Sequence, residues 1–220
     1  MIKNRGLFIK NLIKFKNYNK YLEIGLSNNP NAPYRLITDI ETKHSVDMNP
    51  NTNPDFVADS NTFFNMLHNE SFSCLDKDYK WDIIFIDGAH MAQQVYLDLC
   101  NSFNHLDENG IIIMHDVLPW SYDMTIEADV GLREATCQDA WKVIEYCLKE
   151  RNDMHICTLE ENNGGLGLIT KAKEKRIPIL SKEYNKFYQF DVYIQERNKY
   201  MNTIREDEVL EWLEKPYYNF

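Results

Sequence analysis

The chain lacks any apolar run near the roughly 18 residues that a membrane-spanning helix needs, and its amino terminus has no continuous apolar stretch typical of export signals. A paired cysteine pattern is also absent. The five cysteines are odd in number and form no C-x-x-C pair, which is typical of reduced thiols in a cytosol-like compartment. We therefore expect a protein without a membrane span that works in the cytoplasm, or in the host cytoplasm if its source is a virus.

Basic residues are fewer than acidic ones, with 24 Lys and Arg against 34 Asp and Glu, which gives a net charge of -10. Because such a surface repels phosphate backbones, we expect no nucleic-acid partner. Residues 1–20 are the exception, since they carry six basic side chains and no acidic one. Apolar residues interleave there at helical spacing: Leu7, Phe8, Leu12 and Phe15. This segment could be a membrane-surface helix or an amphipathic helix packed at the edge of a sheet, and we favour the second.

Three nucleotide-binding and hydrolase motifs are missing from the sequence. No G-x-x-x-x-G-K-[ST] phosphate loop and no G-x-S-x-G nucleophile elbow occur, and no G-x-G-x-x-G follows the first apolar run. The last absence argues against a nicotinamide-dependent oxidoreductase, which remains an alternative because it shares the expected fold.

Short apolar runs alternate with helical patterns along the chain, which predicts an α/β fold built around a mostly parallel sheet. The runs at 155–159 and 166–170 are separated by a tight turn and can only pair antiparallel, so the sheet is mixed. The expected strands are residues 21–24, 44–47, 55–58, 81–86, 111–114, 155–159 and 166–170, and the expected helices are 34–41, 59–68, 91–105 and 140–148.

Two segments lie outside this alternation. Residues 117–136 form a long stretch of mixed character, which in compact domains is usually a lid or a binding element. Residues 172–220 are charged and tyrosine-rich, with helical patterns around Tyr184, Phe187, Tyr188 and Ile194 and around Val209, Leu210, Trp212 and Leu213. This helical tail could cover the site, form a homo-oligomer or cap the core, and the sequence does not decide between these roles.

Acidic residues, histidines or a glycine follow each of the first five predicted strands. In doubly wound sheets, ligands bind outside the carboxyl ends of the strands, so these positions are the candidate site. They are Glu23 and Gly25, then Asp47, then Asp59, then Asp87 with His90, and finally His115 with Asp116.

Gly25 and Asp47 have the arrangement of a nucleotide site. A glycine after the first strand allows a ligand to approach the backbone closely, and Asp47 follows it by 47 − 25 = 22 residues. This is close to the offset of about 20 at which an acid accepts ribose hydroxyls. Asp59, followed by Ser60, could accept from an adenine amine or could cap the next helix.

Five stretches together carry a resemblance to a known family, and two later ones agree with it. They are Tyr21-Leu22-Glu23-Ile24-Gly25, Val46-Asp47, Phe56-Val57-Ala58-Asp59-Ser60, Phe85-Ile86-Asp87-Gly88-Ala89-His90 and Met114-His115-Asp116-Val117-Leu118-Pro119, with Ala140-Trp141-Lys142-Val143 and Gly164-Gly165-Leu166-Gly167-Leu168-Ile169. They resemble class I S-adenosylmethionine-dependent methyltransferases, in particular a subgroup with F-I-D-G-x-H and H-D-x-x-P elements. One position departs from the pattern, because many members carry a second glycine where this chain has Ser27.

The resemblance implies a Rossmann-like, doubly wound mixed sheet of seven strands, the last antiparallel, with helices on both faces. It implies a methyltransferase domain over residues 21–171, with an amphipathic segment before it and the helical tail after it. Glu23 and Gly25 would line the methionine side of S-adenosylmethionine, Asp47 the ribose and Asp59 the adenine. The full cofactor-binding set is Glu23, Gly25, Asp47, Met48, Asp59, Ser60 and Asp87.

Methyl transfer to a hydroxyl requires alignment of the reactants and removal of a proton. Two mechanisms fit the tips of the fourth and fifth strands. Asp87, His90 and Asp116 could hold a divalent cation such as Mg²⁺ or Mn²⁺, as related sugar and macrolide methyltransferases do. Alternatively, His115 or His90 could act as the base, so the catalytic candidates are Asp87, His90 and His115.

The leading hypothesis is therefore O-methylation of a small-molecule or sugar/glycan hydroxyl. A nicotinamide-dependent oxidoreductase, a metal-dependent hydrolase and a non-catalytic nucleotide-binding module are the alternatives. A hydrolase would have no need of Asp47 and Asp59, and a binding module would tolerate loss of His90, His115 and Asp116.

Overall fold

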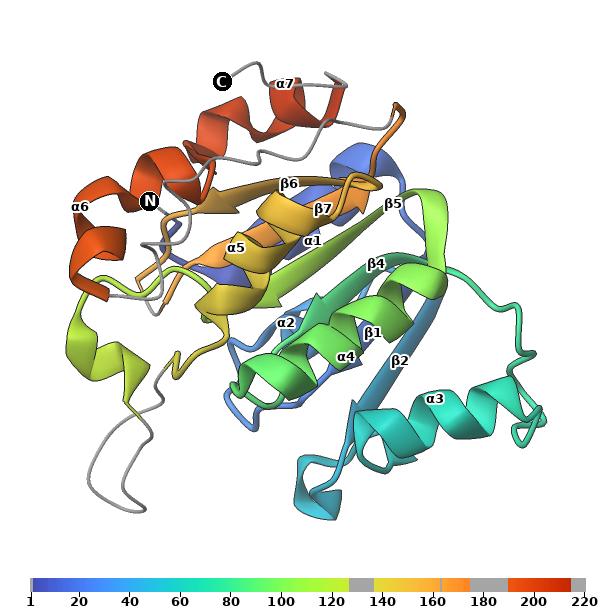
Figure 1. Cartoon of the computed structure of the whole chain (residues 1–220). Coiled ribbons are helices and arrows are strands. Elements are labelled where there is room, and N and C mark those ends of the chain that lie inside the picture. The colour runs from blue at the N-terminus through green and yellow to red at the C-terminus, as the bar shows by residue number, and fades with distance from the viewer. Residues whose placement is uncertain (1, 127–136, 163, 175–189, 215–220) are drawn as a thin grey trace. The chain divides into compact units, whose positions relative to one another are not determined.

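A computed structural model describes residues 2–126, 137–162, 164–174 and 190–214 of the chain (Figure 1). The elements are α1 (Arg5–Lys16), β1 (Lys20–Ile24), α2 (Pro33–Leu36), β2 (Thr42–Asp47), η1 (Pro50–Thr52), β3 (Phe56–Val57), α3 (Ser60–His68), β4 (Trp81–Ile86), α4 (Ala92–Asn104), β5 (Leu106–His115), η2 (Tyr122–Thr125), α5 (Trp141–Glu150), β6 (Met154–Leu159), β7 (Leu166–Lys171), α6 (Phe190–Tyr200), β8 (Thr203–Ile204), η4 (Glu206–Glu208) and α7 (Val209–Glu214).

The strands form one mixed sheet in the order β3-β2-β1-β4-β5-β7-β6-β8. Parallel pairs join β1 to β2, β1 to β4 and β2 to β3, and β7 pairs antiparallel with β6. The predicted Rossmann-like class is confirmed. Within the described part of the chain the sheet has eight strands and not seven, because β8 in the tail pairs parallel with β6. A strand of two residues is too short to produce a period-two pattern in the sequence.

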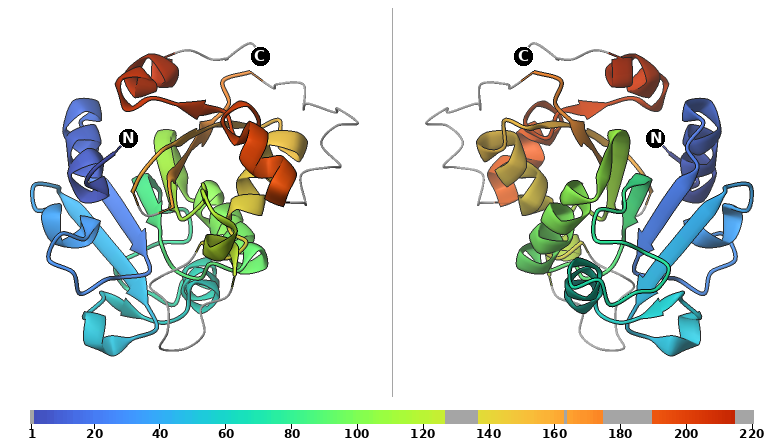
Figure 2. Two further views of the ribbon diagram at one scale, coloured as in Figure 1. Left: turned by 90° about the vertical axis from the view of Figure 1, so that its left-hand side faces the viewer. Right: turned by 90° about the vertical axis from the view of Figure 1, so that its right-hand side faces the viewer.

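The chain divides into two compact units. An N-terminal unit comprises Asn4–Ala89 and Gln93–Ile113. In this unit α1 and α2 lie on one face of the strands, and α3 and α4 on the other (Figures 1 and 2). Because helices cover both faces, β1 and β4 are buried along most of their length, and Tyr21, Leu22, Ile83 and Ile84 are 0% exposed.

Helix α1 confirms the predicted amino-terminal helix but not its predicted apolar face. The side chain of Asn4 accepts a hydrogen bond from the amide of Leu7, and the helix ends at Asn17 in the left-handed region. The buried positions are Gly6, Ile9, Leu12 and Ile13. Leu7 and Phe15, which the sequence pattern assigns to the apolar face, are 51% and 55% exposed.

Helix α2 is shorter than predicted and β5 is longer. The predicted helix at 34–41 stops at Leu36, because Ile37 takes extended backbone and buries its side chain. Strand β5 begins at Leu106 and not at residue 111, since Asn109-Gly110 lies within the strand and not at a turn. A side chain at Gly110 would lie 2.8 Å from the carbonyl oxygen of Asp82.

A C-terminal unit comprises Met1–Lys3, His90–Ala92 and Met114–Phe220. The predicted hairpin of β6 and β7 is confirmed, with Leu159 opposite Leu166. Its turn contains Gly164 and Gly165, whose φ angles of 110° and 75° favour glycine. Of the predicted tail helices, α6 and α7 are present, whereas Tyr184, Phe187 and Tyr188 lie outside the described residues, as do residues 127–136 of the predicted lid.

Candidate active site

Gly25 forms a tight turn at the end of β1. Its φ angle is 86°, and a Cβ atom there would lie 2.3 Å from the carbonyl oxygen of Asp87 and 2.6 Å from the Cα of Gly88. Its amide donates a hydrogen bond to the carbonyl of Val46 at the end of β2. The turn therefore requires glycine on two grounds, the backbone angle and the close approach of the chain after β4.

Asp47 stabilises this turn from the end of β2. One carboxylate oxygen accepts from the amide of Leu26 at 2.6 Å, and the other accepts from the amide of Asn49 at 2.7 Å. A carboxylate has about four acceptor positions, so Asp47 can still accept from two ligand hydroxyls. The neighbouring Met48 is 73% exposed, and its side chain is available to a ligand at this turn.

Glu23 is buried inside β1 and faces Tyr21, whose hydroxyl donates a hydrogen bond to it. Burial raises the pKa of Glu23 to about 8, while the Tyr21 hydrogen bond and the Arg5 charge act in the opposite direction. Glu23 is therefore mostly protonated at neutral pH and can donate a hydrogen bond to a ligand.

Asp59 and Ser60 make local contacts at the start of α3. Asp59 is the N-cap of this helix, and its two oxygens accept from the amide and the hydroxyl of Thr62 at 2.9 and 2.7 Å. These bonds hold the pKa of Asp59 below its usual value. The hydroxyl of Ser60 donates to the buried Asp98 at 2.5 Å. The geometry thus matches the capping alternative that the sequence left open.

Asp87, directly after β4, faces a basic residue that the sequence analysis did not single out. The Nη2 atom of Arg5 lies 3.4 Å from the Asp87 carboxylate. Arg5 comes from the first turn of α1, outside the segment that carries the family resemblance. A single basic residue in a basic segment has no feature that marks it as part of a site.

Asp116 is the centre of a buried cluster of side chains. Its Oδ2 atom lies 3.0 Å from Nδ1 of His115 and 3.2 Å from Nε2 of His90. The other ring nitrogen of His115, Nε2, lies 3.4 Å from the carboxylate of Glu161. The thiol of Cys137 lies 3.7 Å from the second carboxylate oxygen of Asp116. Burial, followed by the charge of Asp116, raises the pKa of this thiol, which stays protonated.

Backbone conformation places Asp116 in this position. Its φ angle of 59° lies in the left-handed region, which is unusual for a residue other than glycine. Gly164 packs against it so closely that a Cβ atom there would lie 2.2 Å from the Asp116 carboxylate. The amide of Leu118 also donates a hydrogen bond to the carbonyl of Gly164 at 2.6 Å.

Glu161 is a cluster member that the sequence analysis missed. It lies two residues beyond β6 and is 4% exposed. The same rule that selected the residues after the first five strands would have selected Glu160 and Glu161 after the sixth. In the sequence, however, Glu160 and Glu161 directly precede a polar hairpin turn. Nothing in the sequence pattern there distinguishes a buried acid from a solvent-exposed one.

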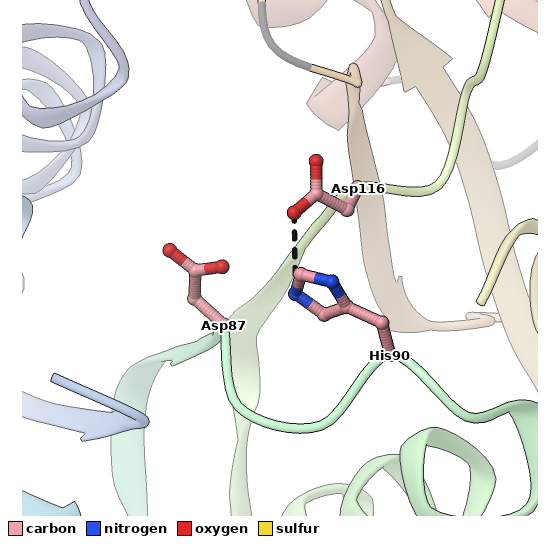
Figure 3. A group of neighbouring side chains, drawn as sticks. All are labelled: Asp87, His90 and Asp116. Atoms are coloured by element: carbon pink, nitrogen blue, oxygen red, sulfur yellow. Dashed lines mark ion pairs between the residues drawn. The ribbon is translucent and has the colours of Figure 1, made fainter. Parts of the chain in front are cut away.

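Three of the predicted residues fit the geometry of a cation site. Asp87, His90 and Asp116 each offer one ligand atom, and these atoms lie within 4.8 Å of one another (Figure 3). Oxygen and nitrogen ligands bound about 2.0–2.6 Å from one ion lie at most about 5 Å apart, so the donor set fits a divalent cation of the Mg²⁺ or Mn²⁺ type. Figure 3 shows the His90 ring directed at the Asp116 carboxylate.

Residues 26–117 match a family model described as a methyltransferase domain. The matched segment runs from the turn after β1 to just beyond β5, and it contains Asp47, Asp59, Asp87, His90 and Asp116. No curated protein matches the chain in sequence.

Several solved structures have a similar fold. An O-methyltransferase from Bacillus cereus in complex with SAH is 14% identical, with a TM-score of 0.53 over 78% of this chain and 82% of that one. The cofactor-bound protein Rv0187 from MTB is 12% identical, with a TM-score of 0.56 over 78% and 81%. The O-methyltransferase TomG from Streptomyces achromogenes, in complex with SAM, is 12% identical, with a TM-score of 0.53 over 76% and 79%.

Identities this low establish the fold alone. The fold is the Rossmann-like fold of class I methyltransferases, as the sequence predicts. The match over residues 26–117 supports the predicted class of enzyme independently of the structures.

Proposed function

We propose that this protein is an S-adenosylmethionine-dependent O-methyltransferase that acts on a hydroxyl of a small molecule or a sugar. The observation that carries the proposal is the group formed by Asp87, His90 and Asp116. These residues follow β4 and β5 and lie within the segment that matches a methyltransferase domain. Such a group can hold or deprotonate a hydroxyl at the position where methyl transfer takes place.

The proposed methyltransferase domain covers residues 21–171. Residues 1–20 and 172–220 are additions to it, although Arg5 of the first addition contacts Asp87. Net charge argues against a nucleic-acid partner. No helix among the described residues is long and apolar enough to cross a membrane. A homo-oligomer formed through the tail stays a prediction.

In this proposal the cofactor binds at the turns after β1 and β2. Asp47 accepts the ribose hydroxyls, because its oxygens retain acceptor positions beyond their bonds to Leu26 and Asn49. Gly25 allows close approach, and Glu23 and Met48 complete the methionine and ribose sides. Both oxygens of Asp59 already accept from Thr62, so the proposal depends on Asp47 more than on the adenine contact of Asp59 and Ser60. Bound S-adenosylmethionine supplies the electrophilic methyl group.

The acceptor hydroxyl must lose its proton, and two kinds of group can promote this. Asp87, His90 and Asp116 would hold a divalent cation, which lowers the pKa of a hydroxyl bound to it. The alternative is a histidine base, and the surroundings of the two candidate rings support His90 over His115. Both ring nitrogens of His115 face carboxylates, and its side chain is 4% exposed, so both nitrogens are already occupied by contacts within the cluster. His90 is more accessible, so we assign the base role to His90.

Calorimetry tests the proposal directly. We expect micromolar binding of S-adenosylmethionine and of S-adenosylhomocysteine, and no binding of NAD, because the turn after β1 lacks the glycine pattern of nicotinamide-binding proteins. Absence of binding by both sulfur compounds would reject the proposal, and binding of NAD alone would favour the oxidoreductase.

Two variants separate the cofactor site from the cation site. Asp47→Ala should weaken binding of S-adenosylhomocysteine, whereas Asp116→Ala should leave it unchanged and lower the affinity for Mn²⁺ by at least about 10- to 100-fold. The exposed Asp78 in the loop before β4 provides the control variant Asp78→Ala, which should change neither affinity. Retained Mn²⁺ binding and retained turnover in Asp116→Ala would show that the assigned site is wrong.

A further inference from the structure

The C-terminal unit contains a cavity of about 240 Å³ beside the Asp116 cluster. It is lined by Leu118, Trp120, Glu160, Glu161, Asn162 and Arg197. These residues come from three places in the chain, namely the segment after β5, the turn between β6 and β7, and helix α6. Drug-sized ligands occupy cavities of roughly 300–1,000 Å³, so this one has room for a single ring of a larger molecule.

The lining combines one exposed aromatic surface with fixed polar groups. Trp120 is 46% exposed, which is unusual for an indole in this protein. Arg197 is held by two contacts, a 3.0 Å ion pair with Glu160 and a 3.3 Å hydrogen bond to the carbonyl of Pro119. Arg197 and Glu160 are therefore preorganised and need little ordering when a ligand binds.

The charges of the lining argue against an anionic ligand. Among the described lining residues, Glu160 and Glu161 contribute two carboxylates, and Arg197, already paired with Glu160, contributes one positive charge. The net negative charge of the lining would repel a phosphate, a carboxylate or a coenzyme A thioester. Neutral hydroxyls, in contrast, can donate hydrogen bonds to both carboxylates.

The cavity is connected to the candidate active site through Glu161. This residue lines the cavity and also lies 3.4 Å from His115, which in turn contacts Asp116. A ring bound in the cavity would thus share Glu161 with the cluster around Asp116.

We propose that this cavity binds the acceptor, and that the acceptor presents a neutral, hydroxylated sugar ring there. The apolar face of the ring would stack on Trp120, and its hydroxyls would contact Glu160, Asn162 and Arg197. Trp120 and Leu118 give the cavity an apolar surface for the face of such a ring, and Glu160, Asn162 and Arg197 offer hydrogen-bond partners for its hydroxyls. This inference rests on the proposed function.

Trp120 provides a spectroscopic test, because the chain has four tryptophans and the other three, Trp81, Trp141 and Trp212, are at most 2% exposed. Quenching of intrinsic fluorescence by acrylamide therefore reports mainly on Trp120. We expect methyl glycosides of neutral hexoses and 6-deoxyhexoses, at millimolar concentration, to protect Trp120 from quenching. Protection by a catechol or by a coenzyme A thioester, but by none of the glycosides, would overturn the inference.

Two aromatic variants extend the test, with saturation-transfer NMR of the same glycosides as the measurement. Trp120→Ala should weaken glycoside binding by about tenfold or more. Tyr122→Ala removes a neighbouring aromatic that is 62% exposed and does not line the cavity, and it should leave glycoside binding unchanged. Equal glycoside binding by both variants would overturn the inference.

Calorimetry with S-adenosylhomocysteine on the same samples keeps this inference separate from the proposed function. Trp120→Ala should bind it as the unmodified protein does, since Trp120 is not among the cofactor residues. If the unmodified protein binds S-adenosylhomocysteine but no glycoside, the cavity assignment is wrong and the proposed function stands. If it binds neither, both are wrong.

Discussion

Replacing Gly25 by alanine tests whether the turn after β1 holds the site together. At φ 86° a residue with a Cβ atom costs about 1–2 kcal/mol more than glycine. The new Cβ would also lie 2.3 Å from the Asp87 carbonyl oxygen and 2.6 Å from Gly88. Because these are backbone atoms, no rotamer change can relieve the overlap, and overpacking of this kind costs about 1–3 kcal/mol.

The two effects together predict that Gly25→Ala loses about 2–5 kcal/mol of unfolding free energy. For a chain of this size the melting temperature falls by about 2–4 °C per kcal/mol, so the expected decrease is roughly 4–20 °C. Thermal unfolding followed by circular dichroism measures it. Cofactor affinity should fall as well, because moving Gly25 disturbs the bond between Leu26 and Asp47.

Gly88 supplies the matched control, since it is a glycine on the other side of the same contact. A Cβ atom at Gly88 would find its nearest neighbours, both in Ile24, at 3.8 Å, and its φ angle is not positive. Gly88→Ala should therefore change the unfolding free energy by less than about 0.5 kcal/mol. If Gly25→Ala melts within a degree or so of Gly88→Ala, the close approach of the two turns is not as the structure has it.

Two further predictions concern buried groups. Burial raises the pKa of Glu145 from 4.5 to about 7, and its Oε2 atom accepts no hydrogen bond from the described residues. The contribution of the protonated carboxyl group to the unfolding free energy is fully present below pH 4.5 and is lost as the pH rises through about 7. In urea unfolding, Glu145→Gln should therefore gain stability relative to the unmodified protein between about pH 5 and 8. A difference between the two proteins that does not change with pH would contradict this. The second prediction concerns the cysteines, whose reaction with thiol reagents is followed by mass spectrometry. The exposed Cys74 should react in the folded protein, whereas the fully buried Cys137, Cys147 and Cys157 should react only after unfolding. Labelling of Cys137 before unfolding would contradict the described packing.

The sequence predicts the central strands well because burial on both faces leaves a strong signal. Strand β4 begins and ends where the apolar run of Trp81 to Ile86 does, and the hairpin of β6 and β7 follows from its short connection. The errors occur where tertiary contacts override local pattern. Helix α2 ends early because Ile37 is buried in an extended conformation, and the outward side of α1 carries Leu7 and Phe15.

The candidate site is only partly visible in the sequence. The position of a residue at the end of a strand selects Asp87, His90 and Asp116, which the structure groups together. Residues that enter the site from elsewhere give no such signal. Arg5 reaches Asp87 from a helix 82 positions away in the chain, and Glu161 reaches His115 from 46 positions away.

Asp116 shows why such contacts cannot be inferred from spacing alone. Its left-handed backbone costs about 1–3 kcal/mol and persists only if the surroundings determine it. Those surroundings include two histidines and the turn at Gly164, which lies 164 − 116 = 48 residues later and leaves room for the carboxylate only because it has no side chain. The aspartate and the glycine therefore form one structural feature. A side chain at Gly164 would displace the Asp116 carboxylate from His90, although in the sequence Gly164 looks like an ordinary turn glycine.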